Sequence, residues 1–180
     1  MNILCGIDEA GRGPLAGPMI VAGVVIKKPI DGLNDSKKLT EKKREALFNI
    51  IKENTTYHIV TTSNKQIDEF GLSFCISNSI KEIMSNIKAN SYLMDGNTTF
   101  GIKGLDCLIK ADQSVQEVSA ASILAKVTRD RYMKDIAKEY PLYNFEKHKG
   151  YGTKAHIEAI KQHGFSKLHR LSYKIKGVNS

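Results

Sequence analysis

A long and largely apolar helix constrains the fold of this chain more than any other feature of its sequence. Residues 117–140 have helical periodicity, and the first half of the segment, from Val118 to Val127, is apolar nearly all round. A helix without a polar face must be buried. Its small residues, 119–122 and Ala125, permit a close approach to the backbone of a sheet. We therefore expect this helix to lie against a β-sheet in the core.

The other periodic segments supply such a sheet and further helices. Apolar, β-prone runs predict strands at residues 3–7, 19–26, 57–62, 91–94 and 107–111. Helical periodicity predicts further helices at residues 37–53 (beginning near Thr40), 64–87 (with a break at Gly71) and 153–163. Strands dominate early and helices later, with βα alternation between them. This order predicts an α/β fold with a mixed β-sheet flanked by helices, and 180 residues suit one compact domain.

The net charge of +8 is concentrated in the last third of the chain. Residues 1–125 hold 14 basic and 14 acidic side chains, whereas residues 126–180 hold 13 basic and 5 acidic ones. Such an asymmetry suits a surface that faces a polyanion. A solvated, solubilising surface explains the charge equally well, so charge alone does not identify the partner.

The sequence favours a cytoplasmic protein that does not enter a membrane. No run approaches the ~20 apolar residues that a spanning helix needs. The first residues lack the basic and long apolar segments of a secretory signal. Cys5, Cys75 and Cys107 are widely spaced in apolar surroundings, so we expect reduced core thiols. Nothing in the sequence demands a dimer, and we expect a monomer.

Four acidic residues stand at the ends of predicted strands. Asp8 and Glu9 follow the first strand, and Asp95 and Asp112 follow two later ones. If these strands share a sheet, the carboxylates can converge, which is costly unless a cation lies between them. An all-carboxylate set without nearby His or Cys suits Mg²⁺ or Mn²⁺. Each acid alone is explained as a turn or cap residue; the four together favour a metal site.

Two glycine-containing segments offer a substrate site beside these acids. In Gly11-Arg12-Gly13, backbone amides can approach a phosphate or sugar, and the guanidinium adds forked donors. Farther along, Tyr151 is framed by glycines and cations and can stack on a sugar or base. Taken alone, the first segment is a tight turn and the second a lead-in to a helix with Thr153 as N-cap.

Three basic residues are further candidates for contact with phosphates. Lys37 lies at the start of a predicted helix, and Lys126 and Arg129 lie near the middle of the long helix. Each of them, taken alone, is more typical of a solvated surface.

Blocks along the whole chain resemble the bacterial ribonuclease HII family. The two most specific blocks are residues 8–18, DEAGRGPLAGP, and residues 119–130, SAASILAKVTRD. Four shorter blocks follow the same pattern, in chain order 35–39 (DSKKL), 94–97 (MDGN), 148–153 (HKGYGT) and 169–172 (HRLS). The resemblance implies a ribonuclease H-like mixed sheet flanked by helices, with a small helical C-terminal part.

The resemblance also implies an organisation and an activity. Residues 1–140 would form the catalytic core, and residues 141–180 a basic helical segment that packs on the core and contacts substrate. The implied activity is endonucleolytic cleavage of the RNA strand of RNA·DNA hybrids, and of duplex DNA at single embedded ribonucleotides.

Residue by residue, the resemblance assigns the following roles. Four acids match the family's catalytic, metal-binding carboxylates: Asp8, Glu9, Asp95 and Asp112. Gly11, Arg12 and Gly13 match the loop that senses the ribonucleotide 2′-hydroxyl, and Tyr151 matches a tyrosine that stacks at the junction. The chain departs from many relatives in having Ala111, where they have glycine, directly before the fourth acid.

These assignments lead to a mechanistic hypothesis with two divalent ions, Mg²⁺ or Mn²⁺. The ions, ~3.5–4 Å apart, would straddle the scissile phosphate, one activating water and the other stabilising the leaving 3′ oxygen. The products would carry 5′-phosphate and 3′-hydroxyl ends. Selection of RNA over DNA must depend on the 2′-hydroxyl, since it is the local chemical difference.

Two alternatives from other classes remain at this point. A non-catalytic, basic nucleic-acid-binding protein would explain the charge but would leave the strand-end acids without a purpose. Another two-metal nuclease, such as a DNA nuclease or resolvase, would use the acids but not the 2′-hydroxyl. Redox and acyl-transfer enzymes are disfavoured, because no dinucleotide fingerprint, Cys-x-x-Cys or Gly-x-Ser-x-Gly occurs.

Overall fold

The computed structural model describes residues 2–33 and 39–180. Lys37, one of the candidate phosphate contacts, lies outside the described residues. The helices and strands are, in chain order, β1 (Leu4–Ala10), β2 (Met19–Ile26), α1 (Glu41–Asn54), β3 (Thr55–Thr62), α2 (Asn64–Phe70), α3 (Leu72–Asn86), β4 (Ser91–Asp95), β5 (Leu105–Leu108), the 3₁₀ helix η2 (Ala111–Gln113), α4 (Gln116–Ile136), the 3₁₀ helices η3 (Ala137–Glu139) and η4 (Pro141–Tyr143), α5 (Phe145–His148) and α6 (Lys154–His163). Across the described ranges, no helix is long and apolar enough to cross a membrane.

The five strands form one mixed sheet in the order β3-β2-β1-β4-β5. β2 pairs antiparallel with β1 and with β3, whereas β4 pairs parallel with β1 and with β5. A parallel pair needs a crossover connection, and the chain crosses from β3 to β4, beside β1, through α2 and α3. The predicted α/β class with a mixed sheet is confirmed.

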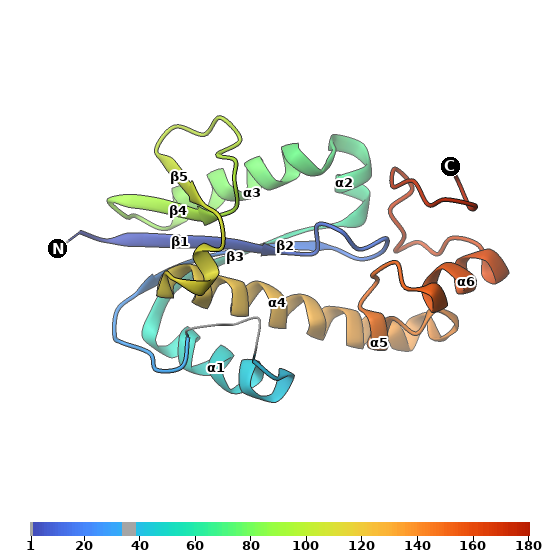
Figure 1. The fold of residues 1–180 in the computed structure, drawn as a ribbon, viewed down its shortest axis with the longest axis horizontal. Helices are drawn as coiled ribbons and strands as arrows, with labels where there is room; N and C mark the ends of the chain where they lie inside the picture. Colours follow the sequence, from blue (N-terminus) through green and yellow to red (C-terminus); the bar gives the residue numbers. More distant parts are fainter. Residues whose placement is uncertain (1, 34–38) are drawn as a thin grey trace.

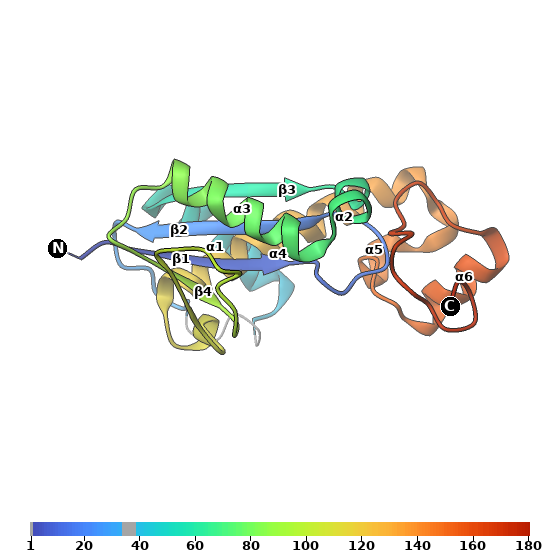
Figure 2. The ribbon, with the colours of Figure 1, turned by 90° about the horizontal axis from the view of Figure 1, so that it is seen from above.

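Helices cover both faces of the sheet (Figure 1, Figure 2). α3 packs on one face, in a buried cluster that includes Ile80, Ile83 and residues of β1 and β2. α4 and α1 pack on the other face, where most residues in the first half of α4 are buried. A Cβ on Gly6 of β1 would lie 2.3 Å from backbone atoms of α4, so glycine permits this close approach. The expected position of the long helix against a sheet is confirmed.

Local chemistry fixes the ends of several helices where the sequence predicted them. The Thr40 hydroxyl accepts a hydrogen bond from the backbone amide of Lys43 and caps α1. Gly71, with φ of +82°, separates α2 from α3. Thr153 caps α6, which ends at Gly164. The long helix ends earlier than expected, at Ile136, and continues as the 3₁₀ turn η3.

The last part of the chain forms a third buried cluster at one end of the sheet (Figure 1). Met133 at the end of α4 packs there with Phe145 of α5 and Ile160 of α6. Ala16, from the loop between β1 and β2, belongs to the same cluster. The loop that follows the paired acids is therefore attached to the C-terminal segment.

Three details of the sequence prediction are wrong. Asp8 and Glu9 lie inside β1 rather than after it, because pairing with β2 continues to Ala10. β5 ends at Leu108, so Asp112 lies not at a strand end but in the 3₁₀ turn η2. Cys5 and Cys75 are buried as expected, but Cys107 is only half-buried; all three thiols are free.

Candidate active site

Asp8 is placed by the pleat of the central strand. Successive side chains of a strand point to opposite faces, so Asp8 shares a face with Gly6, which contacts α4. Glu9 shares the other face with Ile7, which packs in the α3 cluster. On β4, Met94 belongs to the α3 cluster, and Asp95 therefore points to the same side as Asp8. Parallel pairing of β1 and β4 brings the two aspartates together.

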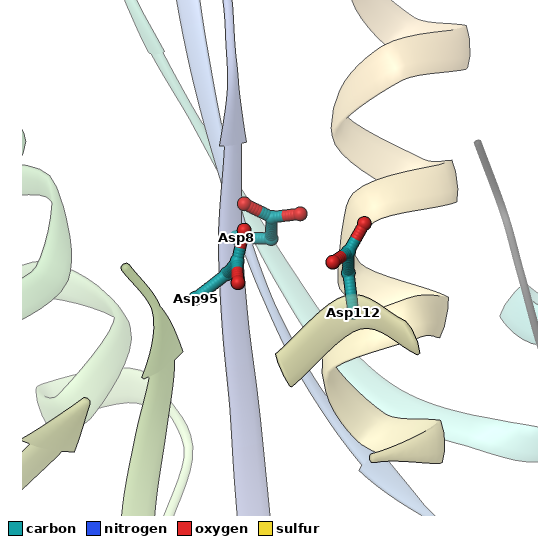
Figure 3. Close-up of side chains that lie close together, drawn as sticks. All are labelled: Asp8, Asp95 and Asp112. Carbon is teal, nitrogen blue, oxygen red and sulfur yellow. The ribbon is translucent and has the colours of Figure 1, made fainter. Parts of the chain in front are cut away.

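Asp8, Asp95 and Asp112 converge on one point (Figure 3). One carboxylate oxygen from each lies within 4.8 Å of the others. Asp8 and Asp112 are buried and Asp95 is half-buried. Three of the four expected acids thus gather from three separate segments, β1, β4 and η2.

Asp95 also fixes the turn that carries Asp112. Its Oδ1 accepts a hydrogen bond of 2.8 Å from the backbone amide of Ala111, the first residue of η2. Lys110, just before, has a left-handed conformation with φ of +60°, which turns the chain back toward β4. The turn therefore replaces the strand end that the sequence suggested, and it brings the fourth acid to the same place.

The electrostatics of the cluster are unfavourable in the absence of a cation. Burial raises the pKa of Asp8 well above its usual range, and the charges of Glu9 and Asp95 raise it further. Ser122 on α4 and the backbone amide of Glu9 act in the opposite direction, because they donate to the ionised carboxylate. A buried set of like charges of this kind is a natural site for a cation.

Glu9 does not belong to the triad. Its Oε1 pairs with the Arg12 guanidinium at 2.9 Å. Its Oε2 is buried and has no hydrogen-bond partner among the described residues. Burial raises the pKa of Glu9, while Arg12 lowers it and Asp95 raises it. The acids whose carboxylate oxygens come together within the described residues are thus Asp8, Asp95 and Asp112, and Glu9 lies beside them, lining the same pocket as Asp8 and Asp95.

A pocket of about 410 Å³ opens over these acids. It is lined by residues from the sheet, the β1–β2 loop, α1, α4 and the C-terminal segment: Asp8, Glu9, Ala10, Gly11, Arg12, Gly13, Arg44, Asp95, Ser122, Ile123, Lys126 and Tyr151. The sequence-predicted loop and tyrosine thus share one cavity with Asp8, Glu9 and Asp95. Tyr151 is exposed, as a stacking platform must be.

Comparison with known proteins places the chain in a family. The family model for Ribonuclease HII matches residues 5–176. Ribonuclease HII of Aliarcobacter butzleri is 62% identical over 180 residues, which cover 99% of this chain and 94% of the relative. The chain belongs to the ribonuclease HII family. The Campylobacter jejuni ribonuclease HII is 56% identical over 173 residues, 96% of this chain and 91% of the relative.

Solved ribonucleases of this type have the same fold. The ribonuclease HII of Archaeoglobus fulgidus, solved in complex with PCNA, matches with a TM-score of 0.83 at 25% identity, over 97% of this chain and 96% of that one. Ribonuclease H2 of Pyrococcus horikoshii matches with a TM-score of 0.78 at 30% identity, over 96% of this chain and 94% of that one. The resemblance to ribonuclease HII and the ribonuclease H-like fold expected from the sequence are therefore confirmed.

Membership of the ribonuclease HII family makes the chain a ribonuclease H, a divalent-metal-dependent hydrolase. The alternative of a non-catalytic binding protein is not favoured. The acidic triad supplies oxygen ligands, the type that hard divalent ions prefer.

Arg129 is not placed as the sequence suggested. It is only 1% exposed, and its guanidinium donates to the backbone carbonyls of Ala16, Pro18 and Lys149. Its burial argues against a direct contact with substrate, and Arg129 is not among the residues that line the pocket. Lys126, in contrast, is half-buried at the pocket wall and pairs with Asp130 at 2.8 Å.

Sequence reasoning missed two residues of the pocket. Arg44 on α1 reaches the pocket while its guanidinium donates to the Leu39 carbonyl. Ser122 on α4 lies close enough to Asp8 to affect its ionisation. Arg44 lies among other charged residues at the start of its helix, and nothing local distinguishes it. Ser122 was noted only for its small size, although a hydroxyl in an otherwise apolar half-helix is itself a signal.

Proposed function

We propose that this ribonuclease hydrolyses the RNA strand of RNA·DNA hybrids and cuts duplex DNA at single embedded ribonucleotides, leaving 5′-phosphate and 3′-hydroxyl ends. The observation that carries the proposal is the convergence of Asp8, Asp95 and Asp112 beside the Gly11–Gly13 loop. Carboxylates alone repel a phosphate, so their role requires a cation. A loop of glycines at the same pocket offers recognition of the sugar next to that phosphate.

We propose Mg²⁺ or Mn²⁺ as the cation, held by the triad together with Glu9. The donor set consists of oxygen atoms, three of them within 4.8 Å of one another, and hard divalent ions prefer such ligands. The buried Oε2 of Glu9 is a further oxygen available for ligation. Divalent ions in a site of this type supply an activated water and stabilise charge on the leaving 3′ oxygen.

The protein's own side chains position the substrate and neutralise the charge of its phosphate. Asp95 orients the turn that carries Asp112, through its bond to Ala111. Lys126 lies at the pocket wall, where its ammonium can face a phosphate. Tyr151 offers an exposed ring on which a sugar or base can stack. These groups hold the phosphate in line with the acids, and positioning of that kind supplies much of the acceleration in phosphoryl transfer.

In this proposal, Gly11, Arg12 and Gly13 select RNA over DNA. Gly11 has φ of +99°, a conformation that side chains rarely adopt, and all three residues line the pocket. A site built to hydrogen-bond a hydroxyl discriminates strongly against the analogue that lacks it, because its polar groups are then left unpaired.

We also propose that residues 1–140 act as the catalytic core and residues 141–180 as a basic helical segment that contacts substrate. The segment packs on the end of α4 and contributes Tyr151 to the pocket. We also propose that the protein is a cytoplasmic monomer; its three free thiols are in keeping with a reducing compartment. Binding of a hybrid should weaken steeply with added salt, because the basic residues of this segment release counterions. A flat salt response would contradict that role.

The deciding experiment is cleavage of duplex DNA that contains one ribonucleotide, with Mg²⁺, Mn²⁺ or chelator, and with the cut mapped by end-labelling. We expect one incision at the ribonucleotide that leaves a 5′-phosphate, and no incision with chelator. The same duplex without the 2′-hydroxyl is the matched substrate. Equal cleavage of both duplexes would favour another two-metal nuclease, and metal-independent cleavage would refute the assigned chemistry.

A further inference from the structure

Two buried arginines hold the loop between β1 and β2. Arg129 of α4 is 1% exposed, and Arg170, in the C-terminal segment, is 0% exposed. Neither forms an ion pair with a carboxylate within the described part of the chain. Their partners are instead backbone carbonyls, most of them in residues 11–18.

Arg170 binds the part of the loop that lines the pocket. Its guanidinium donates to the carbonyls of Gly11 (2.6 Å), Arg12 (2.9 Å) and Gly17 (3.0 and 3.1 Å). The Tyr173 hydroxyl donates to the same Arg12 carbonyl at 2.6 Å and accepts from Arg170 at 2.9 Å. The backbone amide of Arg170 donates to Leu15 at 2.8 Å. The side chain and backbone amide of Arg170 thus hold the loop at residues 11, 12, 15 and 17.

Arg129 binds the same loop from the side of α4. It donates to the carbonyls of Pro18 (2.9 Å) and Ala16 (3.1 Å), and to Lys149 (2.8 Å) in the segment that precedes Tyr151. The contact is close, since a Cβ on Gly11 would lie 2.4 Å from the Arg129 Nε. Arg129 therefore joins the loop to the tyrosine on the other side of the pocket.

The carbonyl contacts fix where the amides of the loop point. In a planar trans peptide, the N–H of the next residue points opposite to the carbonyl. Because the carbonyls of Gly11 and Arg12 face Arg170, the amides of Arg12 and Gly13 face away from it. Neither amide donates a hydrogen bond to another described residue. Two oriented donors are thus left for a ligand at the pocket that these residues line.

The burial of Arg129 and Arg170 is unfavourable if the stability of the fold is its only purpose. Burial lowers the pKa of Arg129 to about 10 and also lowers the pKa of Arg170, yet both remain charged at neutral pH. Two buried like charges without a carboxylate partner are unfavourable compared with apolar residues of similar volume. What the two guanidiniums provide is a planar set of donors, which fixes several carbonyls of one loop at once.

We propose that Arg129 and Arg170, with Tyr173, are positioning residues that set the Arg12 and Gly13 amides for the ribonucleotide 2′-hydroxyl. The inference rests on the proposed function of the Gly11–Gly13 loop. It assigns these residues an effect on catalysis through the loop, not through the metal-binding acids.

The mildest test is Tyr173→Phe, which removes one hydroxyl from the Arg12 carbonyl. Its matched control is Tyr143→Phe, in the same C-terminal segment, where the lost hydroxyl donates to Gly164 at 2.9 Å and not to the loop. On duplex DNA with one ribonucleotide, Tyr173→Phe should lower kcat about tenfold while KM stays within about twofold, because phosphate contacts remain. The Mn²⁺ concentration for half-maximal activity should not change. Tyr143→Phe should keep the wild-type kcat.

A second pair of variants tests the guanidinium itself. Arg170→Lys keeps the charge but loses the fork, and Arg170→Met loses both. We expect a larger fall in kcat for each than for Tyr173→Phe, with partial retention by lysine. Hydrogen–deuterium exchange across residues 11–18 should be faster in Arg170→Lys and Tyr173→Phe than in the wild type, and unchanged in Tyr143→Phe.

The outcomes separate the two proposals. An unchanged kcat and unchanged exchange in Tyr173→Phe and Arg170→Lys would overturn the positioning role. An equal loss in Tyr143→Phe would also overturn it, since the effect would then be one of general stability. Failure of the proposed function would appear differently, as a wild-type enzyme that does not cut at the ribonucleotide, and the exchange measurement would still decide whether the loop is held.

Discussion

Replacement of Asp8 by asparagine should abolish cleavage and, in the absence of metal, stabilise the fold. Asp8 is 5% exposed and lies within 4.8 Å of two other carboxylates. The metal-free protein therefore keeps a buried, repelled charge that asparagine removes with almost no change in shape. The same change removes an oxygen ligand, so function and metal-free stability should move in opposite directions.

Two estimates bound the gain in stability that Asp8→Asn should show without metal. Two unit charges 4.8 Å apart repel by about 3.5 kcal/mol at an effective dielectric constant of about 20. The wild type can avoid this by taking up a proton, and protonating a carboxyl of ordinary pKa, about 3.9, at pH 7 costs about 4 kcal/mol. The gain at pH 7 should therefore lie between about 1 and 4 kcal/mol, the lower figure allowing for relaxation of the site.

The sign of the pH dependence is fixed by the direction of the shift. Burial and neighbouring charges raise the pKa of Asp8 in the folded state above its unfolded value. The protonated Asp8 side chain therefore makes its full contribution to the stability of the wild type below about pH 4. This contribution is lost, relative to Asp8→Asn, as the pH rises toward the folded pKa of Asp8. The gap between the two proteins should be small near pH 4 and largest at neutral pH.

The assay is urea denaturation in EDTA at pH 7 and near pH 4.5, with Asp106→Asn as the control. Asp106 is exposed on β5, so the same substitution there should change stability by less than about 0.5 kcal/mol. Added Mg²⁺ should stabilise the wild type more than Asp8→Asn, and binding of a hybrid should survive the substitution. A loss of stability in EDTA, or an equal gain in Asp106→Asn, would refute the electrostatic argument. Near-wild-type turnover by Asp8→Asn would refute its role as a ligand.

Three further predictions test the pocket and the C-terminal segment. Gly11→Ala should lower kcat about 100-fold, because Gly11 has φ of +99° and the new Cβ would lie 2.4 Å from the buried guanidinium of Arg129. Gly13→Ala should lower kcat far less, because a Cβ there meets nothing within 4 Å. Equal kinetics of the two variants would contradict this prediction. Tyr151→Ala should raise KM about tenfold while Tyr151→Phe stays near wild type, because stacking needs the ring and not the hydroxyl; steady-state kinetics on a hybrid decide the matter. Burial lowers the pKa of His156 and of His169 to about 4, so the stability from each neutral ring, at most about 3 kcal/mol, is present above pH 6.5 and is lost as the pH falls toward 4. Denaturation curves of the wild type should show that fall, and His156→Gln/His169→Gln should show a shallower one.

Much of the fold was accessible from the sequence because its local signals agree with one another. The apolar first half of α4 predicted a buried helix against a sheet, and the helix ends at Thr40 and Gly71 carried recognisable capping and breaking residues. The ends of two strands were harder to predict from the sequence, because pairing with the neighbouring strand decides where each strand ends. β1 is longer than its apolar run because β2 continues beside it. β5 ends at Leu108, before the turn in which Lys110 adopts a left-handed conformation.

The acids of the site were predictable as a group but not in their individual geometry. Strand-end placement identified Asp8, Asp95 and Asp112, although Asp112 reaches the cluster through η2. The same reasoning put Glu9 with them. Glu9 lines the same pocket but lies beside the three aspartates, because the pleat of a strand sends neighbouring side chains to different faces.

Arg129 shows where charge is a poor guide to position. Its charge assigned it to the surface, yet its spacing did not: Ala121, Ala125, Arg129 and Met133 follow at intervals of four and are all buried on one side of α4. The periodicity of a helix indicates on which side of it a residue lies. A charge indicates only that the side chain needs polar partners, and buried backbone carbonyls can take the place of water in that role. When the two disagree on a helix that is otherwise buried, the geometric signal is the stronger one, and the charged residue is then a candidate for holding backbone in place. By this criterion the sequence alone could have marked Arg129 as part of the loop's support, whereas Arg170, outside any helix or strand, could be found only from the structure.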